Sequence, residues 1–190
     1  MTAVHVTPAQ ALADTRRWLE RAVIGLNLCP FAKAVHAKAQ IHWAVYPESD
    51  AHGLIAALLA EAEALAACDA ALRDTTLLIA PNTLSDFLDF NDLVARADRK
   101  LARAGFDGVL QLASFHPQFQ FGGTDPSDLG NATNRAPYPT LHLLREDSVS
   151  RAAEAFPEAE AIFGRNIETL EALGAEGWTA LDVGPGAAAP

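Results

Sequence analysis

The chain has 190 residues, half of them hydrophobic and a fifth charged, with a formal net charge of -10 at pH 7. This length fits one domain, and the negative charge argues against nucleic acid or an anionic membrane as a general partner. No apolar run approaches the roughly 20 residues that a membrane helix needs, and residues 1–10 do not resemble a secretory signal. Two cysteines, Cys29 and Cys68, do not suggest a disulfide framework. We expect a cytoplasmic single domain over residues 1–183 and a disordered tail over 184–190.

Helical signals open the chain. Thr7 is a hydroxyl N-cap, Pro8 follows at the first helical position, and Gln10 stands where a capping box needs it. Apolar residues then recur at helical spacing, which predicts a helix over about 8–27. Pro30 suits the first position of a second, short helix that ends near residue 37, with Cys29 as its N-cap.

Strands and helices alternate through the rest of the chain. Amphipathic segments predict four more helices. One begins at residue 54, and the next extends from a T-x-x-D cap at Thr83 to Gly105. The last two cover about 148–155 and 157–173, and Pro157 begins and Gly174 ends the final one. Short β-branched or continuous apolar runs predict four strands. These strands are Ile41–Tyr46, Thr75–Ala80, Val109–Ser114 and Thr140–Arg145.

This alternation predicts an α/β fold, in which a mainly parallel sheet of about four strands is covered by helices on both faces. Right-handed crossovers make the first three strands run in the same direction, so their carboxyl ends share the sheet edge where such folds bind ligands. No helix separates the third predicted strand from the fourth. We therefore expect the fourth strand to return antiparallel from that edge.

Residues 115–139, FHPQFQFGGTDPSDLGNATNRAPYP, form a long irregular segment at that edge. Loops beyond about 15 residues are usually functional or disordered. Four aromatic residues supply an apolar body here, and four prolines reduce the freedom of the backbone, so we expect an ordered, shaped loop.

The polar residues of this loop are candidates for substrate binding. Arg135 has the planar guanidinium that matches a carboxylate or phosphate, and Asn131 and Asn134 can donate amide hydrogens. Tyr138 and His142 are expected nearby. The alternative is that these residues only build turns, with the arginine paired to a loop aspartate.

Cys29 is the candidate nucleophile. A thiol at a helix N-terminus has a lowered pKa, which favours the reactive thiolate. If the short helix packs antiparallel to the first strand, Cys29 faces His116, and the two form a nucleophile–base pair. The alternative is a buried, structural cysteine among apolar neighbours.

Common cofactor motifs are missing from the sequence. It contains no G-x-x-x-x-G-K-[ST], G-x-G-x-x-G or G-x-S-x-G, and no C-x-x-C or H-E-x-x-H pair. His116 and His142 with Cys29 or Asp128 give only a weak metal signal, so we assign no metal and leave the cofactor unknown.

Five stretches in order, LNLCPFA, FLDFNDLVARAD, SFHPQFQFGG, NATNRAPYP and LHLLRE, resemble the DUF1415 family of uncharacterised bacterial proteins. The resemblance extends from about residue 15 to 183 and implies one intact domain. It carries over only the motif positions themselves: Cys29, Pro30, Phe90, Asn91, His116, Pro117, Phe119, Asn131, Asn134, Arg135, Pro137, Tyr138, Pro139, His142, Arg145 and Glu146.

Three functions fit these features. The first is an enzyme that acts on a small anionic substrate by acyl transfer, amide hydrolysis or thiol redox chemistry, with Cys29 and His116 as catalytic pair. The second is a non-catalytic protein that binds a small molecule or a metal, with residues 115–139 as the binding loop. The third is a protein–protein module that exposes Phe119, Phe121 and Tyr138. The oligomeric state is not predicted.

Overall fold

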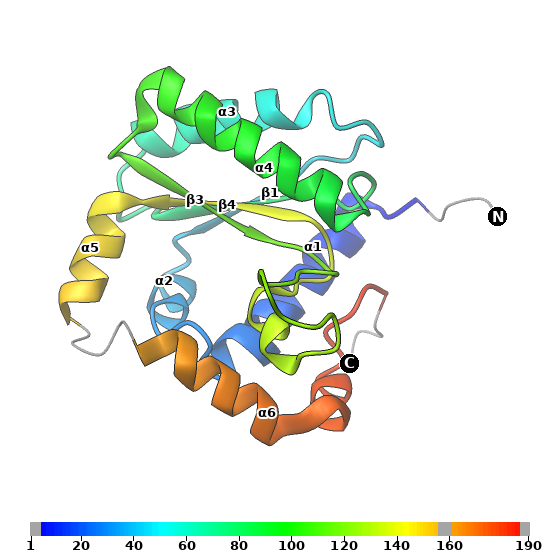
Figure 1. Ribbon diagram of the computed structural model, residues 1–190. Coiled ribbons are helices and arrows are strands. Elements are labelled where there is room, and N and C mark those ends of the chain that lie inside the picture. Colours follow the sequence, from blue (N-terminus) through cyan, green and yellow to red (C-terminus); the bar gives the residue numbers. More distant parts are fainter. Residues whose placement is uncertain (1–4, 156–160, 187–190) are drawn as a thin grey trace.

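The computed structural model describes residues 5–155 and 161–186 (Figure 1). Its centre is a four-stranded sheet in the order β1-β2-β4-β3. The strands are β1 (Ile41–Val45), β2 (Thr75–Ile79), β3 (Leu110–Phe115) and β4 (Thr140–Arg145). All four predicted strands are confirmed to within one residue at each end.

The strand directions follow the predicted path of the chain. β1 and β2 pair in parallel, and β4 pairs antiparallel with both β2 and β3. Strands β1, β2 and β3 therefore share one direction, and β4 returns against them as expected. Because β4 lies between β2 and β3, the sheet has one parallel and two antiparallel pairings. The description "mainly parallel" holds for strand directions but not for the pairings.

Helices cover both faces of the sheet. Figure 1 shows α3 (Leu54–Ala67) and α4 (Phe87–Leu101) above it, and α1 (Pro8–Trp18), α2 (Ala32–Ala37) and α6 (Ile162–Ala180) below it. Helix α5 (Glu146–Ala155) follows β4 directly. Both crossover helices, α3 and α4, lie on the same face because the path through β1, β2 and β3 moves across the sheet in one direction with one handedness.

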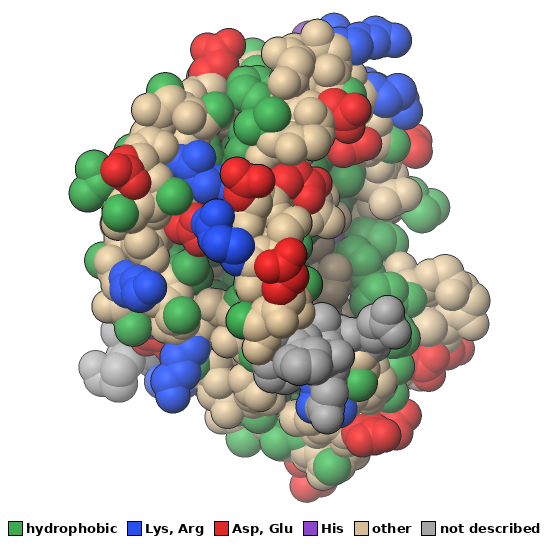
Figure 2. All heavy atoms as spheres, turned by 90° about the vertical axis from the view of Figure 1, so that its left-hand side faces the viewer, with side chains coloured by type: hydrophobic (Ala, Val, Ile, Leu, Met, Phe, Trp, Pro, Cys, Tyr) green, Lys and Arg blue, Asp and Glu red, His purple; other side chains and the backbone are tan. Residues whose placement is uncertain are grey.

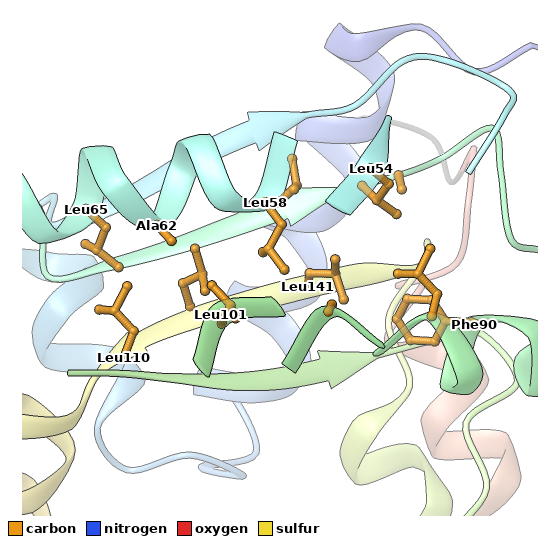
Figure 3. Packing of buried hydrophobic residues seen from close by; sticks show 13 residues of the cluster. Leu54, Leu58, Ala62, Leu65, Phe90, Leu101, Leu110 and Leu141 are labelled. Atoms are coloured by element: carbon orange, nitrogen blue, oxygen red, sulfur yellow. The ribbon is translucent and has the colours of Figure 1, made fainter. Parts of the chain in front are cut away.

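The larger core lies between the sheet and these two crossover helices (Figure 3). Alternate residues of β4, Leu141 and Leu143, point to this face, and Leu54 and Phe90 meet them from α3 and α4. All four side chains are buried. Since side chains of a strand alternate between faces, His142 and Leu144 must point to the opposite face, toward α1 and α2.

Two predicted helix starts are wrong. Asp86, not Thr83, caps α4, because its carboxylate accepts the N–H groups of Leu88 and Asp89 at 2.8 and 3.1 Å. Helix α2 begins at Ala32, and Cys29 is not its N-cap. Residues 29–32 form a turn instead, in which the Cys29 carbonyl accepts the Ala32 N–H at 3.2 Å.

Three of the predicted helices also depart from regular α-helical geometry near their C-terminal ends or at a glycine. The first predicted helix continues past α1 as a π-helical segment, Leu19–Ile24, and α4 continues through Ala102–Phe106, where Gly105 has a φ of 90°. Helix α6 runs beyond its predicted stop but is interrupted there, since Gly174 has a φ of 71°. The predicted start of this helix at Pro157 lies outside the described residues.

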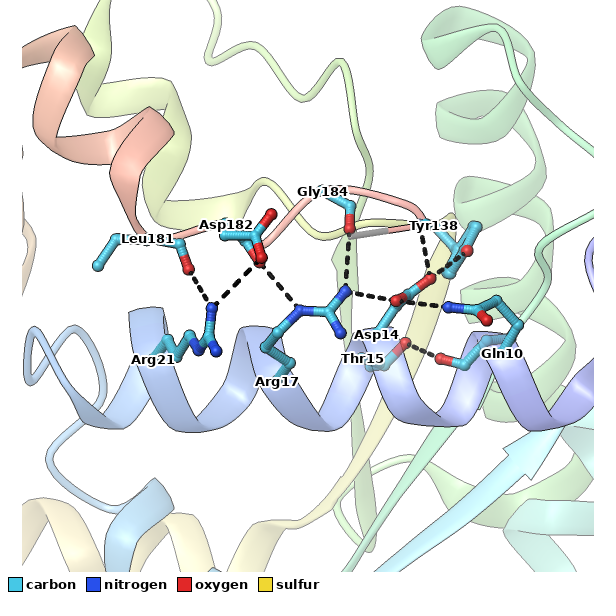
Figure 4. Close-up of polar contacts among 11 residues, drawn as sticks. Gln10, Asp14, Thr15, Arg17, Arg21, Tyr138, Leu181, Asp182 and Gly184 are labelled. Carbon is cyan, nitrogen blue, oxygen red and sulfur yellow. Dashed lines mark hydrogen bonds and ion pairs between the residues drawn. The ribbon is translucent and has the colours of Figure 1, made fainter. Parts of the chain in front are cut away.

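The C-terminal segment packs on α1 (Figure 4). Arg17 donates to the carbonyl oxygens of Asp182 and Gly184, and the Gly186 N–H donates to Asp14. Residues 184–186 of the predicted tail are thus fixed by hydrogen bonds, and 187–190 lie outside the described residues.

The surface seen from the α5 side carries charged side chains of both signs, interspersed with hydrophobic ones (Figure 2). Among the described helices, none has the length and apolar character needed to cross a membrane.

Candidate functional site

Among the concave regions of the described residues, we compare two that lie in different parts of the fold. An open groove lies at the carboxyl edge, between the start of α4 and the long loop, and Arg135 lines it. A cavity of about 490 Å³ lies under the opposite face, between the sheet, the end of α1, α2 and α5. The cavity is the stronger candidate because it is less open and more apolar than the groove, and binding sites for small molecules are usually concave and mostly apolar.

Hydrophobic side chains form most of the cavity wall. They come from the α1 region, from the segment around α2, from all four strands and from α5: Trp18, Val23, Phe31, Val35, Ile41, Leu77, Phe115, Leu144 and Val149. The Trp18 and Phe115 rings meet edge to face, with centroids 5.1 Å apart. Cys29 and His142, both predicted as site residues, line this cavity together.

The hydrogen bonds of Thr75 fix the tautomer of His142. The Thr75 hydroxyl lies 2.6 Å from the Leu143 carbonyl oxygen and 2.6 Å from His142 Nε2. A carbonyl only accepts, so the single hydroxyl hydrogen of Thr75 points to Leu143. Nε2 of His142 must then carry the hydrogen of the second bond, which leaves Nδ1 with a free lone pair.

His142 stays neutral at physiological pH. Burial in its apolar surroundings lowers the pKa of the imidazole to about 4, because the charged form cannot be solvated there. The half-buried ring is therefore a hydrogen-bond acceptor through Nδ1. No residue in 5–155 or 161–186 donates a hydrogen bond to that atom.

Cys29 is also neutral. Burial raises the pKa of its thiol, and this effect outweighs the backbone N–H groups of Phe31 and Ala32, which point at the sulfur and lower it. The expected stabilisation of a thiolate by nearby amides is thus present, but desolvation is larger. Cys68 does not line the cavity.

The sheet separates Cys29 from His116. Cys29 packs with Ile41, Trp43 and Phe115 on the α1 face. His116 follows Phe115 and therefore points to the other face, where its ring stacks on Phe90 with centroids 5.1 Å apart. The expected nucleophile–base pair of Cys29 and His116 is not formed, because the side chains of successive residues point to opposite faces of the sheet.

His116 is fully buried with both ring nitrogens occupied. Nδ1 accepts the N–H of Gln118 at 3.0 Å, so Nε2 carries the hydrogen and donates it to the Leu84 carbonyl, also at 3.0 Å. Burial lowers the pKa of this histidine. The ring holds the start of the long loop against the loop that precedes α4, where Leu84 has a positive φ of 56°.

The asparagines of the long loop bond within the protein. Asn131 is fully buried; its side-chain oxygen accepts from Phe121 and Thr124, and its amide donates to the Asp125 carbonyl. Asn134 donates to the Ser114 carbonyl at 3.4 Å. The expected shaped loop is confirmed, and these interactions are what shape it.

Tyr138 lines neither concave region, and its side chain points toward Asp14 (Figure 4). Its hydroxyl donates to Asp14 at 2.6 Å, and Arg17 pairs with the same carboxylate. Burial and the Asp14 carboxylate raise the pKa of Tyr138. The ring joins the end of the loop to α1.

Arg135 is the one predicted loop residue that lines the groove. Its guanidinium donates to the carbonyl oxygens of Phe119 and Pro126, at 3.2 and 2.7 Å. The exposed side chains of Asp86 and Leu88 share the groove, so a carboxylate stands in the same concave region as the guanidinium.

Sequence reasoning missed the cavity and Thr75. The sequence signal for both was the alternation of side chains between the two faces of two apolar strands. Thr75, Leu77 and Ile79 share one face of β2, and Thr140, His142 and Leu144 share the same face of β4. The register places Leu77 opposite His142. A threonine and a histidine inside buried strands are polar groups that require partners.

Within the described parts of the chain, no three His, Cys, Asp or Glu side chains gather in a way that could hold a metal ion. Searches among curated proteins and among solved structures gave no match. The profile of one family, "Protein of unknown function (DUF1415)", matches residues 10–180. Since this match spans most of the chain, the protein belongs to the DUF1415 family.

Proposed function

We propose that the protein binds a small, largely apolar molecule in the cavity between the sheet and helices α1, α2 and α5. The observation that carries the proposal is a partly open, mostly hydrophobic space of about 490 Å³ beneath the sheet. Binding sites of small molecules commonly have volumes of about 300–1,000 Å³ with few polar groups in a hydrophobic wall. Cys29 and His142 are such polar groups here.

The size of the cavity supports the binding of a specific ligand. It is a weaker match for a space that movements of the surrounding side chains would fill. An apolar cavity of about 150 Å³ in another protein accepts benzene. The cavity beneath this sheet is about three times larger, which suits a ligand of two or three rings or an equivalent chain.

Adjacent alanines of α5 allow a matched test. Ala152 lines the cavity, and Ala153 is exposed beside it. N-phenyl-1-naphthylamine, a neutral apolar dye, should bind the wild-type protein with increased fluorescence. Ala152→Phe should weaken binding at least about tenfold by filling the space, since each 1.4 kcal/mol changes affinity tenfold. Ala153→Phe should bind like wild type. Equal binding by both variants, or no binding to wild type, would contradict the proposal.

A second candidate function is cysteine chemistry in the same cavity, with His142 in the role first given to His116. The observation that favours it is that Cys29 and His142 line the same cavity. It is the weaker proposal because burial raises the pKa of the thiol and lowers that of the imidazole to about 4. Both shifts oppose transfer of the thiol proton to the ring.

The pH dependence of Cys29 alkylation separates the two candidates. A binding protein should show a labelling rate that still rises above pH 9, with the unfolded protein as the reference for an unhindered thiol. Rapid labelling of Cys29 near pH 6 would show a stabilised thiolate, and would favour the catalytic candidate.

A further inference from the structure

We propose that the ligand of this cavity is uncharged and carries a hydroxyl or N–H donor that bonds to Nδ1 of His142. This inference rests on the proposed function, because it names the chemical class of molecule that the cavity accepts. It replaces the small anionic substrate that the sequence led us to expect.

The first step is the direction of the hydrogen bonds around Thr75. Oγ1 of Thr75 has two neighbours at 2.6 Å, the carbonyl of Leu143 and Nε2 of His142. Two acceptors at this separation repel unless a hydrogen lies between them. Thr75 supplies the hydrogen to Leu143, so His142 supplies the other from Nε2.

Nδ1 of His142 is open to the cavity, because it has no hydrogen bond within the described residues and is not a buried atom. A ligand that displaces water from this atom loses affinity unless it supplies a donor in place of the water. His142 lines the cavity, and none of the described residues donates to Nδ1. A ligand with a hydroxyl or N–H group satisfies it from inside the cavity.

The group that meets Nδ1 is not negatively charged. Among the described residues that line the cavity, Arg145 is the cation, and its Nε and Nη2 donate to the carbonyl oxygens of Leu65, Cys68 and Arg73. Asp74 also lines the cavity and carries a like charge. An anionic group at Nδ1 carries no hydrogen to donate, so it would meet the bare lone pair of His142 and lose its hydration.

Three naphthalene probes of similar size test the donor. 2-Naphthol has a hydroxyl donor, 2-methoxynaphthalene has the oxygen without its hydrogen, and 2-naphthoate is an anion. We expect 2-naphthol to bind about 2- to 12-fold more tightly than 2-methoxynaphthalene in calorimetric titration, the range of one net hydrogen bond. 2-Naphthoate should bind most weakly.

His142→Phe should remove the preference for 2-naphthol over 2-methoxynaphthalene while both still bind. His42→Phe is the control, because His42 is exposed and lies on the opposite face of the sheet, beside Glu61 of α3. It should keep the preference. If the His142 variant does not fold, long-range proton–nitrogen spectra of the wild-type protein still decide which ring nitrogen carries hydrogen.

The outcomes separate this inference from the proposed function. Equal binding of 2-naphthol and 2-methoxynaphthalene, tighter binding of 2-naphthoate, or hydrogen on Nδ1 of His142 would overturn the donor inference and leave a binding cavity. Failure of all three probes to bind would overturn the proposed function itself.

Discussion

The long loop at the carboxyl edge and the cavity under the sheet differ in what their polar groups contact. In the loop, His116, Asn131 and Tyr138 each bond to other parts of the chain. In the cavity, His142 keeps an acceptor without a partner among the described residues. The loop is rich in polar residues and the cavity is poor in them. A site is therefore better located by hydrogen-bonding capacity that the fold leaves unused than by the number of polar residues.

The comparison predicts that loop and network substitutions change stability, whereas cavity substitutions change binding. Asp14→Asn should have the largest effect. Asp14 is fully buried and is bonded by Gln10, Arg17, Tyr138 and Gly186, so its loss leaves the buried charge of Arg17 without its carboxylate partner. We expect a loss of about 3–5 kcal/mol in the free energy of unfolding, measured by urea denaturation.

Asp182→Asn is the matched control for this change. Asp182 pairs with Arg21 at 3.5 Å and is half exposed, so the same substitution should cost about 1 kcal/mol or less. Comparable losses in the two variants would contradict the importance of the buried network.

Asn131→Ala should have the next largest effect. It removes three hydrogen bonds and leaves the Phe121 N–H without its acceptor, which should cost about 2–4 kcal/mol. Asn134→Ala removes one bond of 3.4 Å and should cost about 1 kcal/mol or less. Neither should alter the affinity for N-phenyl-1-naphthylamine at temperatures where the protein is folded. A variant that stays stable but no longer binds the dye would move the site to the loop.

The pH dependence of stability should be the smallest effect. Burial lowers the pKa of both His116 and His142, the latter to about 4, below the ordinary value of about 6.5 in an unfolded chain. The unfolded state therefore binds more protons between these values, and stability present above pH 6.5 is lost as the pH falls toward 4. For His142 we expect the free energy of unfolding to be about 1–2 kcal/mol lower at pH 5 than at pH 7.

His142→Phe should reduce the difference in stability between pH 7 and pH 5, and His52→Phe, at an exposed position, should leave it unchanged. An unchanged difference in the His142 variant would show that this ring is solvated, and would also weaken the argument for a neutral acceptor.

Much of the fold was predictable because its signals are local. Continuous apolar runs located β2 and β4, and the missing helix between β3 and β4 correctly indicated an antiparallel return. The position of β4 between β2 and β3 was not predictable, since it depends on how many strand positions the crossover through α4 spans. Helix starts at Thr83 and Pro30 failed where the turns before the helices, around Leu84 and Phe31, displaced the caps.

The site was harder to predict because it depends on which face of the sheet each side chain points to and on how deeply that side chain is buried. Cys29 and His142 were selected for their chemistry, and the structure brings them to one cavity. His116 was paired with Cys29 on the argument that both lie near one edge of the sheet. The side chains of Phe115 and His116 point to opposite faces of the sheet, so His116 is separated from Cys29. The pKa of Cys29 depends on the balance of desolvation and nearby amides, which only packing determines.

One measurement tests the binding cavity most directly: the rate of Cys29 alkylation by iodoacetamide with and without saturating N-phenyl-1-naphthylamine, read by mass spectrometry. Cys29 lines the cavity and Cys68 does not, so Cys68 serves as reference in the same sample. We predict that the dye slows labelling of Cys29 and leaves that of Cys68 unchanged. Unchanged labelling of Cys29 while fluorescence reports bound dye would place the dye elsewhere and contradict the proposed site.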